Sequence, residues 1–307
     1  MSSAALEAKT LEVAIIGAGA WGTALAGVAA RAGHQVTLLA RSPAVADRIR
    51  ETGANEAYLP GIALPAGIRA TSNPVDLGGA KLLLIATPAQ AVRDALTSFA
   101  GGLTEAAAAV VCAKGIERGS HRLMSEILAE VLPGVQPYVL SGPSFAGDVA
   151  RDLPTAVTLA GPTLEAAARL AERLSLRSFR IYASDDIVGV QLGGAVKNVL
   201  AIACGISEGR GLGDSARAAL TTRAFAELAR FGRAMGAKPE TLTGLSGLGD
   251  LVLTCASRQS RNFGYGIALG ARASPPSARP PRCPKACWPA RREPCRSQSC
   301  ATGGWRR

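Results

Sequence analysis

Short apolar runs alternate with polar, glycine-containing segments through the first half of the chain. Runs of four to six residues, rich in valine, leucine, isoleucine and alanine, lie at 11–16, 35–40, 81–86, 107–112 and 137–140. Runs of this length and composition are typical of buried strands. An alanine-rich stretch with the length of a helix separates the first two. This alternation predicts an α/β fold, with a doubly wound parallel sheet between layers of helices.

The pattern changes near residue 186, where long helical segments replace the strands. These segments are expected at 188–205, 216–235 and 249–255. We therefore expect a sheet domain at 1–185, a mainly α-helical domain at 186–270 and a tail at 271–307. The tail holds seven of the 18 prolines and has no apolar periodicity. Such a composition predicts disorder.

The net charge of +11 would by itself suggest an anionic partner, but the charge is concentrated in the tail. Residues 271–307 contain nine lysines and arginines and one acidic residue, a local charge of +8. The other 270 residues carry 25 basic and 22 acidic side chains. We therefore expect no nucleic-acid partner for the folded part of the chain.

Targeting segments and metal motifs are not evident in the sequence. No apolar run reaches the roughly 18 residues of a membrane span, and the N-terminus does not resemble a secretory signal, so we expect a cytoplasmic protein. Cys112, Cys204 and Cys255 are widely separated and are expected to be reduced thiols. The four cysteines at 283–300 match no paired zinc-binding spacing, so no metal site is expected.

The sequence GAGAWG at 17–22 fits the pattern G-x-G-x-x-G between the first strand and the alanine-rich helix. In this context Gly17 permits a tight turn, Gly19 lets the backbone approach a pyrophosphate, and Gly22 lets the helix pack closely. Ala20 and Trp21 begin the helix, whose amide groups would bind the phosphates. We expect a Rossmann-type dinucleotide site. The alternative is a glycine turn with a structural role only.

Arg41 follows the second strand, at the place where NAD-binding domains often carry an acidic residue for the ribose diol. An arginine there can accommodate a 2′-phosphate. We therefore expect NADP to be preferred, with NAD tolerated. The alternative is that Arg41 is a solvated residue at the end of a strand.

Lys197 lies in the middle of the segment 188–206, which is apolar on nearly every side and predicts a buried helix. Gly193 and Gly194 precede it by four and three residues. We therefore expect a surface without side chains beside the lysine, where a small ligand could lie. Burial lowers the pKa of a lysine, which suits a proton donor to an alkoxide. The alternative is a lysine whose ammonium group extends to the surface.

The stretch 244–262, GLSGLGDLVLTCASRQSRN, places hydroxyl, amide and charged side chains among glycines. Arg261 can make forked contacts with a phosphate, while Asp250, Asn262 and the hydroxyl groups can exchange hydrogen bonds with alcohols. The stretch therefore suits a polyol phosphate. The alternative is a polar loop before an ordinary helix.

Taken together, these segments resemble the NAD(P)-dependent glycerol-3-phosphate dehydrogenases of the bacterial type. The resemblance covers about residues 11–270, in the order GAGAWGTALA, NEAYLPG, TPAQAVR, AKGIERG, SGPSFAGDVARDLPTA, GGAVKNVLAIACGISEG, AALTTRAFAE and GLSGLGDLVLTCASRQSRN. It implies reversible reduction of dihydroxyacetone phosphate to sn-glycerol 3-phosphate with NADP or NAD, for glycerophospholipid synthesis. It also implies a cytoplasmic enzyme that is usually a homodimer.

The resemblance assigns roles to individual residues. It implies that Lys197 is the general acid and base, and that Lys114 contacts both substrate and cofactor. The other implied positions bind substrate (Gly142, Ser144, Asp250, Ser260, Arg261, Asn262) or lie near the cofactor (Ala146, Arg261). Without the resemblance, Lys114 would be interpreted as a loop lysine and Ser144 as a helix N-cap. His34 and His121 have no partner pattern and are expected at the surface.

The chain departs from the family at Gln191, usually a glutamate, at Ser215, usually an asparagine, and after Gly270. There the family continues with helices and an Ala-Glu-Gly segment near the cofactor. We interpret the tail as an out-of-frame translation, so another frame of the DNA beyond codon 270 should encode that segment; its absence from both other frames would contradict this. Loss of the helices is expected to expose apolar surface and to weaken stability and cofactor binding.

Two other functions remain open from the sequence. One is a related Rossmann dehydrogenase for hydroxy acids or ketopantoate, whose substrates offer no phosphate to Arg261. The other is an inactive remnant that binds cofactor, or a nonenzymatic protein that binds anionic polymers through its tail. A panel of substrates separates the first from a glycerol-3-phosphate dehydrogenase, and salt-dependent nucleic-acid binding would indicate the second.

Overall fold

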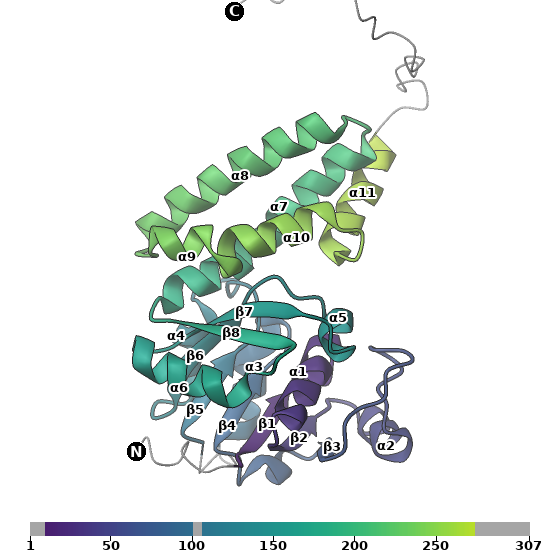
Figure 1. The fold of residues 1–307 in the computed structure, drawn as a ribbon, viewed down its shortest axis with the longest axis vertical. Helices are drawn as coiled ribbons and strands as arrows, with labels where there is room; N and C mark the ends of the chain where they lie inside the picture. The colour runs from purple at the N-terminus through teal and green to yellow at the C-terminus, as the bar shows by residue number, and fades with distance from the viewer. Residues whose placement is uncertain (1–9, 101–105, 274–307) are drawn as a thin grey trace, which may run out of the picture. The chain divides into compact units, whose positions relative to one another are not determined.

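A sheet of eight strands occupies the first part of the chain, and a layer of helices follows it (Figure 1). The structure, a computed structural model, describes residues 10–100 and 106–273. The strands are β1 (Glu12–Ile16), β2 (Gln35–Leu39), β3 (Ile68–Thr71), β4 (Leu82–Ile85), β5 (Ala108–Val111), β6 (Gln136–Ser141), β7 (Thr155–Ala160) and β8 (Phe179–Ser184). The tail predicted to be disordered lies outside the described residues from position 274 onward.

Six α-helices lie between the strands, and five follow the last strand in the part of the chain that the structure describes. Those before Ser184 are α1 (Ala20–Arg31), α2 (Pro43–Thr52), α3 (Val92–Phe99), α4 (Met124–Val131), α5 (Ala146–Ala150) and α6 (Leu164–Leu174). Those after it are α7 (Ile187–Gly209), α8 (Asp214–Ala234), α9 (Pro239–Thr243), α10 (Asp250–Ala256) and α11 (Arg261–Ala273). Short turns complete the set: η2 (Pro74–Leu77), η3 (Ala89–Ala91) and the π-type turn η5 (Leu245–Gly249).

The strand order β3-β2-β1-β4-β5-β6-β7-β8 confirms the predicted doubly wound sheet. The first six strands are parallel and the chain crosses over at β1, which pairs with both β2 and β4. Strand β7 runs antiparallel to β6, and β8 runs parallel to β7. The sequence pattern did not predict β3, β7 or β8. Arg69 interrupts the apolar run of β3, and β8 carries exposed Arg180 and Tyr182, so neither is continuously apolar.

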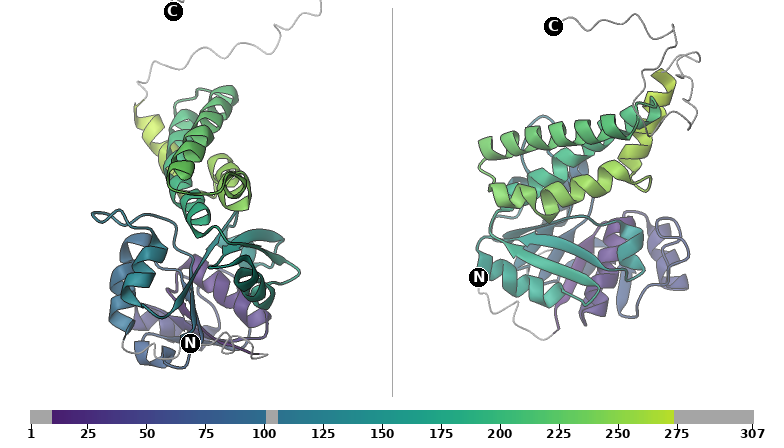
Figure 2. Two further views of the ribbon diagram at one scale, coloured as in Figure 1. Left: turned by 90° about the vertical axis from the view of Figure 1, so that its left-hand side faces the viewer. Right: turned by 45° about the horizontal axis from the view of Figure 1, so that its top comes forward.

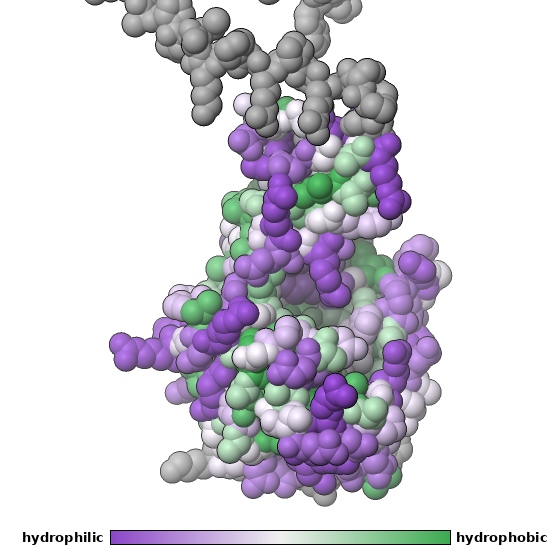
Figure 3. Space-filling model, turned by 90° about the vertical axis from the view of Figure 1, so that its right-hand side faces the viewer, coloured by the Kyte–Doolittle hydropathy of each residue, from purple (hydrophilic) through white to green (hydrophobic). Residues whose placement is uncertain are grey.

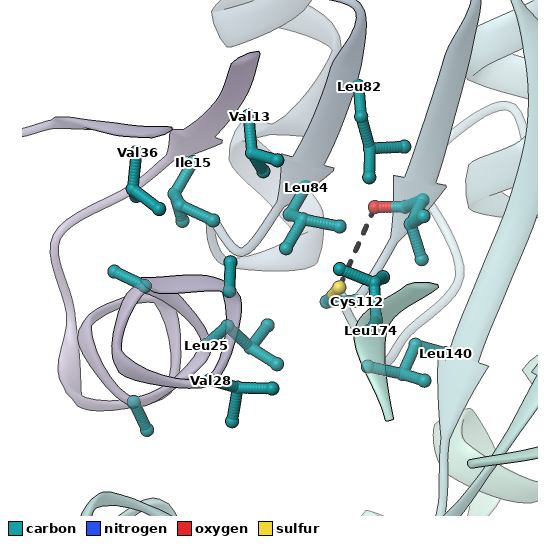
Figure 4. Packing of buried hydrophobic residues seen from close by; sticks show 14 of the residues in the cluster. Val13, Ile15, Leu25, Val28, Val36, Leu82, Leu84, Cys112, Leu140 and Leu174 are labelled. Atoms are coloured by element: carbon teal, nitrogen blue, oxygen red, sulfur yellow. Dashed lines mark hydrogen bonds between the residues drawn. The ribbon is translucent and has the colours of Figure 1, made fainter. Parts of the chain in front are cut away.

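Two apolar cores lie on opposite faces of the sheet, because successive strand residues point to opposite sides. Val13 and Ile15 of β1 face one core, which Leu25 and Val28 of α1 close (Figure 4). Ala14 and Ile16 face the other core, together with residues of α3 and α4. Every strand residue from 13 to 16 is therefore buried, which explains why the run is apolar throughout rather than alternating.

His34 is buried, so the expectation of a surface position was wrong. Its Nδ1 accepts a hydrogen bond from the backbone N–H of Leu11 (3.3 Å), and its Nε2 lies 2.9 Å from the carbonyl oxygen of Arg173. The neutral ring with its proton on Nε2 satisfies both partners. The ring thus joins the start of β1 to the end of α6. His121 lies in an exposed turn, as expected.

His34 should make the stability of the protein fall in mild acid. Burial lowers its pKa below the ordinary value, although the carbonyl of Arg173 opposes the shift. The unfolded chain therefore takes up a proton first, and the free energy of unfolding should decrease as the pH falls below about 6.5. Urea unfolding at several pH values should show a smaller decrease for His34→Gln than for the parent. His121→Asn, at an exposed residue, serves as the control; an unchanged slope in His34→Gln would contradict the assignment.

Helix α7 is the central helix of the second part and packs against α8, α10 and α11 (Figure 2). Its 23 residues are long and apolar enough to cross a membrane by length and composition. The expectation from the sequence concerned uninterrupted apolar runs, and α7 is interrupted by Gln191 and Lys197. Half of the apolar window is buried inside the protein, as is usual for a core helix. Asp186 begins the helix by accepting a hydrogen bond from the N–H of Gly189 (2.7 Å).

Four glycines let α7 and α11 approach to backbone contact. They are Gly205 and Gly209 of α7 and Gly266 and Gly270 of α11, and we call them the glycine seam. A Cβ added to Gly205 would lie 2.2 Å from the carbonyl oxygen of Phe263, and one added to Gly266 would lie 2.2 Å from that of Ile202. The seam was not predicted, because the two pairs are far apart in the sequence.

Gly266→Ala should destabilise the protein by about 1–3 kcal/mol, because the added methyl group forces the two backbones apart. Gly264 lies in the same helix two residues away, is exposed, and has nothing within 4 Å of an added Cβ. Gly264→Ala should therefore be neutral or stabilising by about 0.5–1 kcal/mol, as expected from helix propensity. Denaturant midpoints compare the two variants directly. Equal effects would show that the seam is not tightly packed.

Candidate active site

The glycine turn lies at the carboxyl end of β1, where ligands of doubly wound sheets bind. Gly17 has φ +112°, and a Cβ there would lie 3.1 Å from the backbone of Ala86 and Thr87. A Cβ on Gly22 would lie 1.9 Å from the carbonyl oxygen of Gly17. These two glycines therefore serve the packing of the protein itself. Gly19 has nothing within 4 Å of an added Cβ, so its backbone is open to a ligand.

Polar groups around the turn fit a dinucleotide. The side-chain Oγ1 of Thr87 and Nε1 of Trp21 are buried and have no hydrogen-bond partner among the described residues. Helix α1 begins at Ala20 without a side-chain cap, so its first amide groups can point at phosphate oxygens. Asn55 fixes the turn by donating to the carbonyl oxygen of Ala18 (3.0 Å) and to Thr23 Oγ1 (2.7 Å). The sequence placed Asn55 in a motif but gave it no role.

The other two predicted cofactor positions flank this turn. Arg41 is exposed two residues after β2, the strand that pairs with β1. Ala146 begins α5, which packs against α1. Both are therefore close in the fold to elements that carry the glycine turn, although they are distant from it in the sequence.

Two lysines and one aspartate form the centre of the site. Lys197 of α7 donates to Asp250 Oδ1 (2.5 Å), and Lys114 donates to Asp250 Oδ2 (2.7 Å). Lys197 also donates to Thr254 Oγ1 (3.1 Å), and Lys114 to the carbonyl oxygen of Gly142 (3.1 Å). Asp250 is fully buried and Lys197 is 8% exposed. One carboxylate thus holds two ammonium groups from separate parts of the chain.

The environment of Lys197 makes it easier to deprotonate. Burial and the neighbouring Lys114 lower its pKa to about 8, although Asp250 opposes the shift. A pKa near the working pH suits a group that both gives and accepts a proton. The predicted buried helix with an embedded lysine is therefore present, and the alternative of an ammonium group that extends to the surface is excluded.

The surface beside Lys197 is not open, so the expectation of a ligand against Gly193 and Gly194 was wrong. A Cβ on Gly193 would lie 2.3 Å from the carbonyl oxygen of Ser246, in the π-type turn η5. A Cβ on Gly194 would lie 2.6 Å from Ser141 Oγ and 3.3 Å from Lys114 Cγ. The two glycines instead let η5 and the end of β6 approach α7, which places Asp250 next to Lys197.

Ser141 and Ser246 are site residues that sequence reasoning missed. Both are buried next to these glycines, and neither hydroxyl has a hydrogen-bond partner among the described residues. A buried hydroxyl without a partner is costly. The signal that could have identified Ser141 is its place at the end of β6, directly before Gly142.

The loop that carries Lys114 is held from the side by polar contacts. Arg93 of α3 makes a forked ion pair with Glu117, at 2.8 and 3.0 Å. Gln90 donates to the carbonyl oxygen of Ile116 (2.8 Å) and accepts from the N–H of Arg118 (2.9 Å). These contacts connect the motifs TPAQAVR and AKGIERG and fix the loop after β5.

The predicted phosphate-binding residues lie at the start of α11. Ser260 is buried and caps this helix, because its Oγ accepts from the N–H of Phe263 (3.2 Å). Asn262 donates to Asn198 Oδ1 of α7 (2.9 Å). Arg261 is exposed. The start of α11 is thus attached to α7 beside Lys197, with the arginine free to meet a ligand from solvent.

The alternative interpretation of Ser144 as a helix N-cap was wrong. Its Oγ donates to the carbonyl oxygen of Gly142 (3.1 Å), and α5 begins after Phe145. Gly142 has φ +151°, and a Cβ there would lie 2.8 Å from Val157 Cα. The SGPSF segment therefore makes a tight turn against β7 and presents the carbonyl oxygen that holds Lys114.

The side-chain amide of Gln191 forms hydrogen bonds with Ser125 of α4, not with the lysines. Its Oε1 accepts from the N–H of Ser125 (2.9 Å), and its Nε2 donates to Ser125 Oγ (2.7 Å). The expected change in hydrogen bonding at this position thus affects the junction of α7 with α4, not the centre of the site.

These groups share one edge of the sheet. The glycine turn follows β1, Thr87 follows β4, Lys114 follows β5, and Gly142 follows β6. The face drawn in Figure 3 is hollowed between the sheet domain and the helices, with hydrophilic residues around the hollow. A dinucleotide turn beside a buried lysine of lowered pKa can support hydride transfer coupled to proton transfer.

Comparisons with known proteins agree with this geometry. The sequence profile of the N-terminus of NAD-dependent glycerol-3-phosphate dehydrogenase matches residues 12–167, and that of the C-terminus matches residues 186–279. The second match ends past residue 270, where the resemblance in the sequence was expected to stop. Glycerol-3-phosphate dehydrogenase [NAD(P)+] of Methylobacterium radiotolerans is 59% identical over 265 residues, which cover 86% of this chain and 80% of that protein.

Another relative and a solved structure give the same result. The protein of the same name from Caulobacter vibrioides is 56% identical over 259 residues, covering 84% of this chain and 78% of the relative. The crystal structure of glycerol-3-phosphate dehydrogenase from Coxiella burnetii, 44% identical, matches with a TM-score of 0.82 and covers 86% of this chain and 81% of that chain.

Proposed function

Because the chain belongs to the NAD-dependent glycerol-3-phosphate dehydrogenase family, we propose that it reduces dihydroxyacetone phosphate to sn-glycerol 3-phosphate with NADPH or NADH. The reaction is reversible and supplies glycerophospholipid synthesis. The observation that supports this most strongly is the contact of Lys197 and Lys114 with the two oxygens of Asp250.

Lys197 is the proton donor in this mechanism. When bound, the reduced nicotinamide supplies a hydride to the C2 carbonyl of the substrate. Lys197 Nζ then gives a proton to the carbonyl oxygen, which would otherwise carry a full negative charge. Lys114 stabilises the same oxygen through its positive charge. Asp250 keeps both ammonium groups in place, and Thr254 accepts a second hydrogen bond from Lys197 Nζ.

Residues at the start of α11 bind the phosphate group of the substrate. Arg261 can bind two phosphate oxygens through its guanidinium group, and Asn262 is directed by Asn198. Ser260 lies directly before Arg261 and offers a hydroxyl group there, while Ser144 and Gly142 contribute polar groups beside Lys114. The glycine turn from Gly17 to Gly22 binds the pyrophosphate of the cofactor.

The absorbance of NADPH provides a direct assay of the function. The purified full chain should oxidise NADPH only when dihydroxyacetone phosphate is present, and it should reduce NADP in the presence of sn-glycerol 3-phosphate. Ketopantoate and hydroxy acids lack the phosphate for Arg261 and should not be turned over. Turnover of these substrates in place of the phosphate ester would support the related dehydrogenases instead, and no turnover of any substrate would contradict the proposal.

Arg41 should determine the preference for NADPH. Its exposed guanidinium group, two residues past β2, can pair with the 2′-phosphate. Arg41→Ala should raise the KM for NADPH by about tenfold, the size expected for a charge-assisted contact of about 1.5 kcal/mol. The KM for NADH should not change. Arg48→Ala, which removes an arginine from α2, is the matched control, and an equal effect of Arg41→Ala on both cofactors would contradict this role.

We further propose a cytoplasmic homodimer with a cofactor domain at 1–185 and a substrate domain at 186–270. Exposed apolar side chains on the helical layer support association, among them Val199, Val252 and Tyr265. Sedimentation velocity at several concentrations distinguishes a dimer from a monomer. A monomer at all concentrations would contradict the dimer without affecting the proposed chemistry.

A further inference from the structure

Two buried cysteines lie together behind the active site. Cys204 of α7 and Cys255 of α10 belong to one apolar cluster, with Ala201, Leu251 and Phe263. The two cysteines meet in this cluster because α10 packs against α7, and Thr221 Oγ1 of α8 lies 3.4 Å from Cys204 Sγ. Both thiols are free. The reaction described above uses neither of them.

A groove leads from solvent to Cys255, on one side of this pair. It lies between α8 and α10 and has a volume of about 520 Å³. Its lining includes Thr221, Phe225, Val252 and Cys255. Cys255 and the hydroxyl group beside Cys204 are therefore within reach of a small molecule that enters the groove, although both sulfur atoms are shielded from larger reagents.

The surroundings favour the thiolate of Cys204. The neighbouring Cys255, Thr221 and Arg217 lower the pKa of the Cys204 thiol, against the effect of burial. The thiolate is the form that attacks peroxides and disulfides. Cys112 differs, because burial in the sheet core raises its pKa to about 12. Its thiol faces the carbonyl oxygen of Val110 (Figure 4).

We propose that Cys204 and Cys255 form an oxidisable dithiol, which a hydroperoxide converts to a disulfide that inactivates the enzyme. The Cys204 thiolate attacks a peroxide oxygen, the O–O bond breaks, and the departing oxygen leaves as water or an alcohol after taking up a proton. The sulfenic acid formed on Cys204 then reacts with the Cys255 thiol, and the S–S bond forms as water departs. Two thiols lose two electrons, and the peroxide gains them.

Inactivation follows from the position of Cys255 on α10, and this part rests on the proposed function. The same helix carries Asp250 and Thr254, which hold Lys197. An S–S bond is shorter than a contact between two thiols, so it draws α10 towards α7. A displacement of about 1 Å in a catalytic group can cost about 10²-fold in rate. Reduction of the disulfide returns α10 to its place and restores activity.

Peptide mapping tests the dithiol without using activity. The full chain, with the four tail cysteines at 283–300 replaced by serine, is treated with hydrogen peroxide and digested under conditions that block free thiols. We expect a cross-linked pair of peptides containing Cys204 and Cys255, with the loss of two hydrogen atoms per chain. Cys112 should stay reduced. Oxidation to sulfinic acid without a cross-link, or a cross-link that includes Cys112, would overturn the proposal.

Activity then tests the consequence. Peroxide should lower the rate of dihydroxyacetone phosphate reduction by about tenfold or more, and dithiothreitol should restore it. Cys204→Ser and Cys255→Ser should each resist inactivation, whereas the control Cys112→Ser should be inactivated like the parent. A cross-linked protein with full activity, or inactivation of both serine variants, would overturn the switch. If the reduced parent protein had no activity, the proposed function would be contradicted. The dithiol would still be tested, because peptide mapping does not depend on turnover.

Discussion

Lys197→Ala should lower kcat for the reduction of dihydroxyacetone phosphate by about 10²- to 10⁴-fold, the range contributed by a positioned proton donor. The ratio kcat/KM should fall by a similar factor, because the lost interaction acts in the transition state. Stopped-flow or steady-state absorbance of NADPH measures both. A small primary amine added to the variant should restore part of the rate, since it can take the place of the missing ammonium group.

Lys238→Ala is the matched control for this substitution. Lys238 is 46% exposed and pairs with Asp185 at 2.6 Å, away from the lysines of the site. Its removal should leave kcat unchanged and cost at most about 1 kcal/mol in stability. Circular dichroism of both variants confirms that they fold. If Lys197→Ala kept more than about a tenth of the parent's kcat, another group would have to supply the proton.

Asp250→Asn should destabilise the protein by about 3–5 kcal/mol, because it leaves the buried ammonium group of Lys197 and the partly buried one of Lys114 without the anion that pairs with both. The free energy of unfolding in urea measures this loss. Asp185→Asn, which breaks the exposed pair with Lys238, should cost less than about 1 kcal/mol. Equal costs would show that the buried pairing contributes no more than a surface contact.

The same substitution should move the pH dependence of the reaction. Asp250 raises the pKa of Lys197, so its removal lowers that pKa below the value of about 8 in the parent. Reduction requires the ammonium form, and its rate should fall as the pH rises through this pKa. In Asp250→Asn the decline should therefore occur at lower pH. A profile that does not shift would show that Lys197 is not the group being titrated.

Local patterns were sufficient for the parts of the site that depend on short-range geometry. The glycine turn needs a strand before it and a helix after it, and both lie within 30 residues of Gly17. Lys197 in an apolar helix is likewise a local feature. The roles drawn from the family resemblance, including those of Ser144 and Ala146, could not have been derived from neighbouring residues alone.

Features that depend on contacts between distant segments were missed or misinterpreted. His34 is buried because Arg173, 139 residues away, provides a carbonyl oxygen. Gly193 and Gly194 were recognised as positions without side chains, but the sequence could not show that η5 and Ser141 fill the space beside them. The sequence also could not show that the two oxygens of Asp250, expected to bind alcohol groups, accept hydrogen bonds from the two lysines. In each case the deciding neighbour comes from another element of the fold.

The glycine seam fixes the distance between the backbones of α7 and α11. Lys197 belongs to α7, and Arg261 and Asn262 begin α11, which the seam presses against α7. Because the two helices meet backbone to backbone, the spacing of the segments that carry the proton donor and the proposed phosphate ligands is set by the seam itself. A substitution that separates the helices should therefore disturb the alignment of the substrate as well as the stability of the fold.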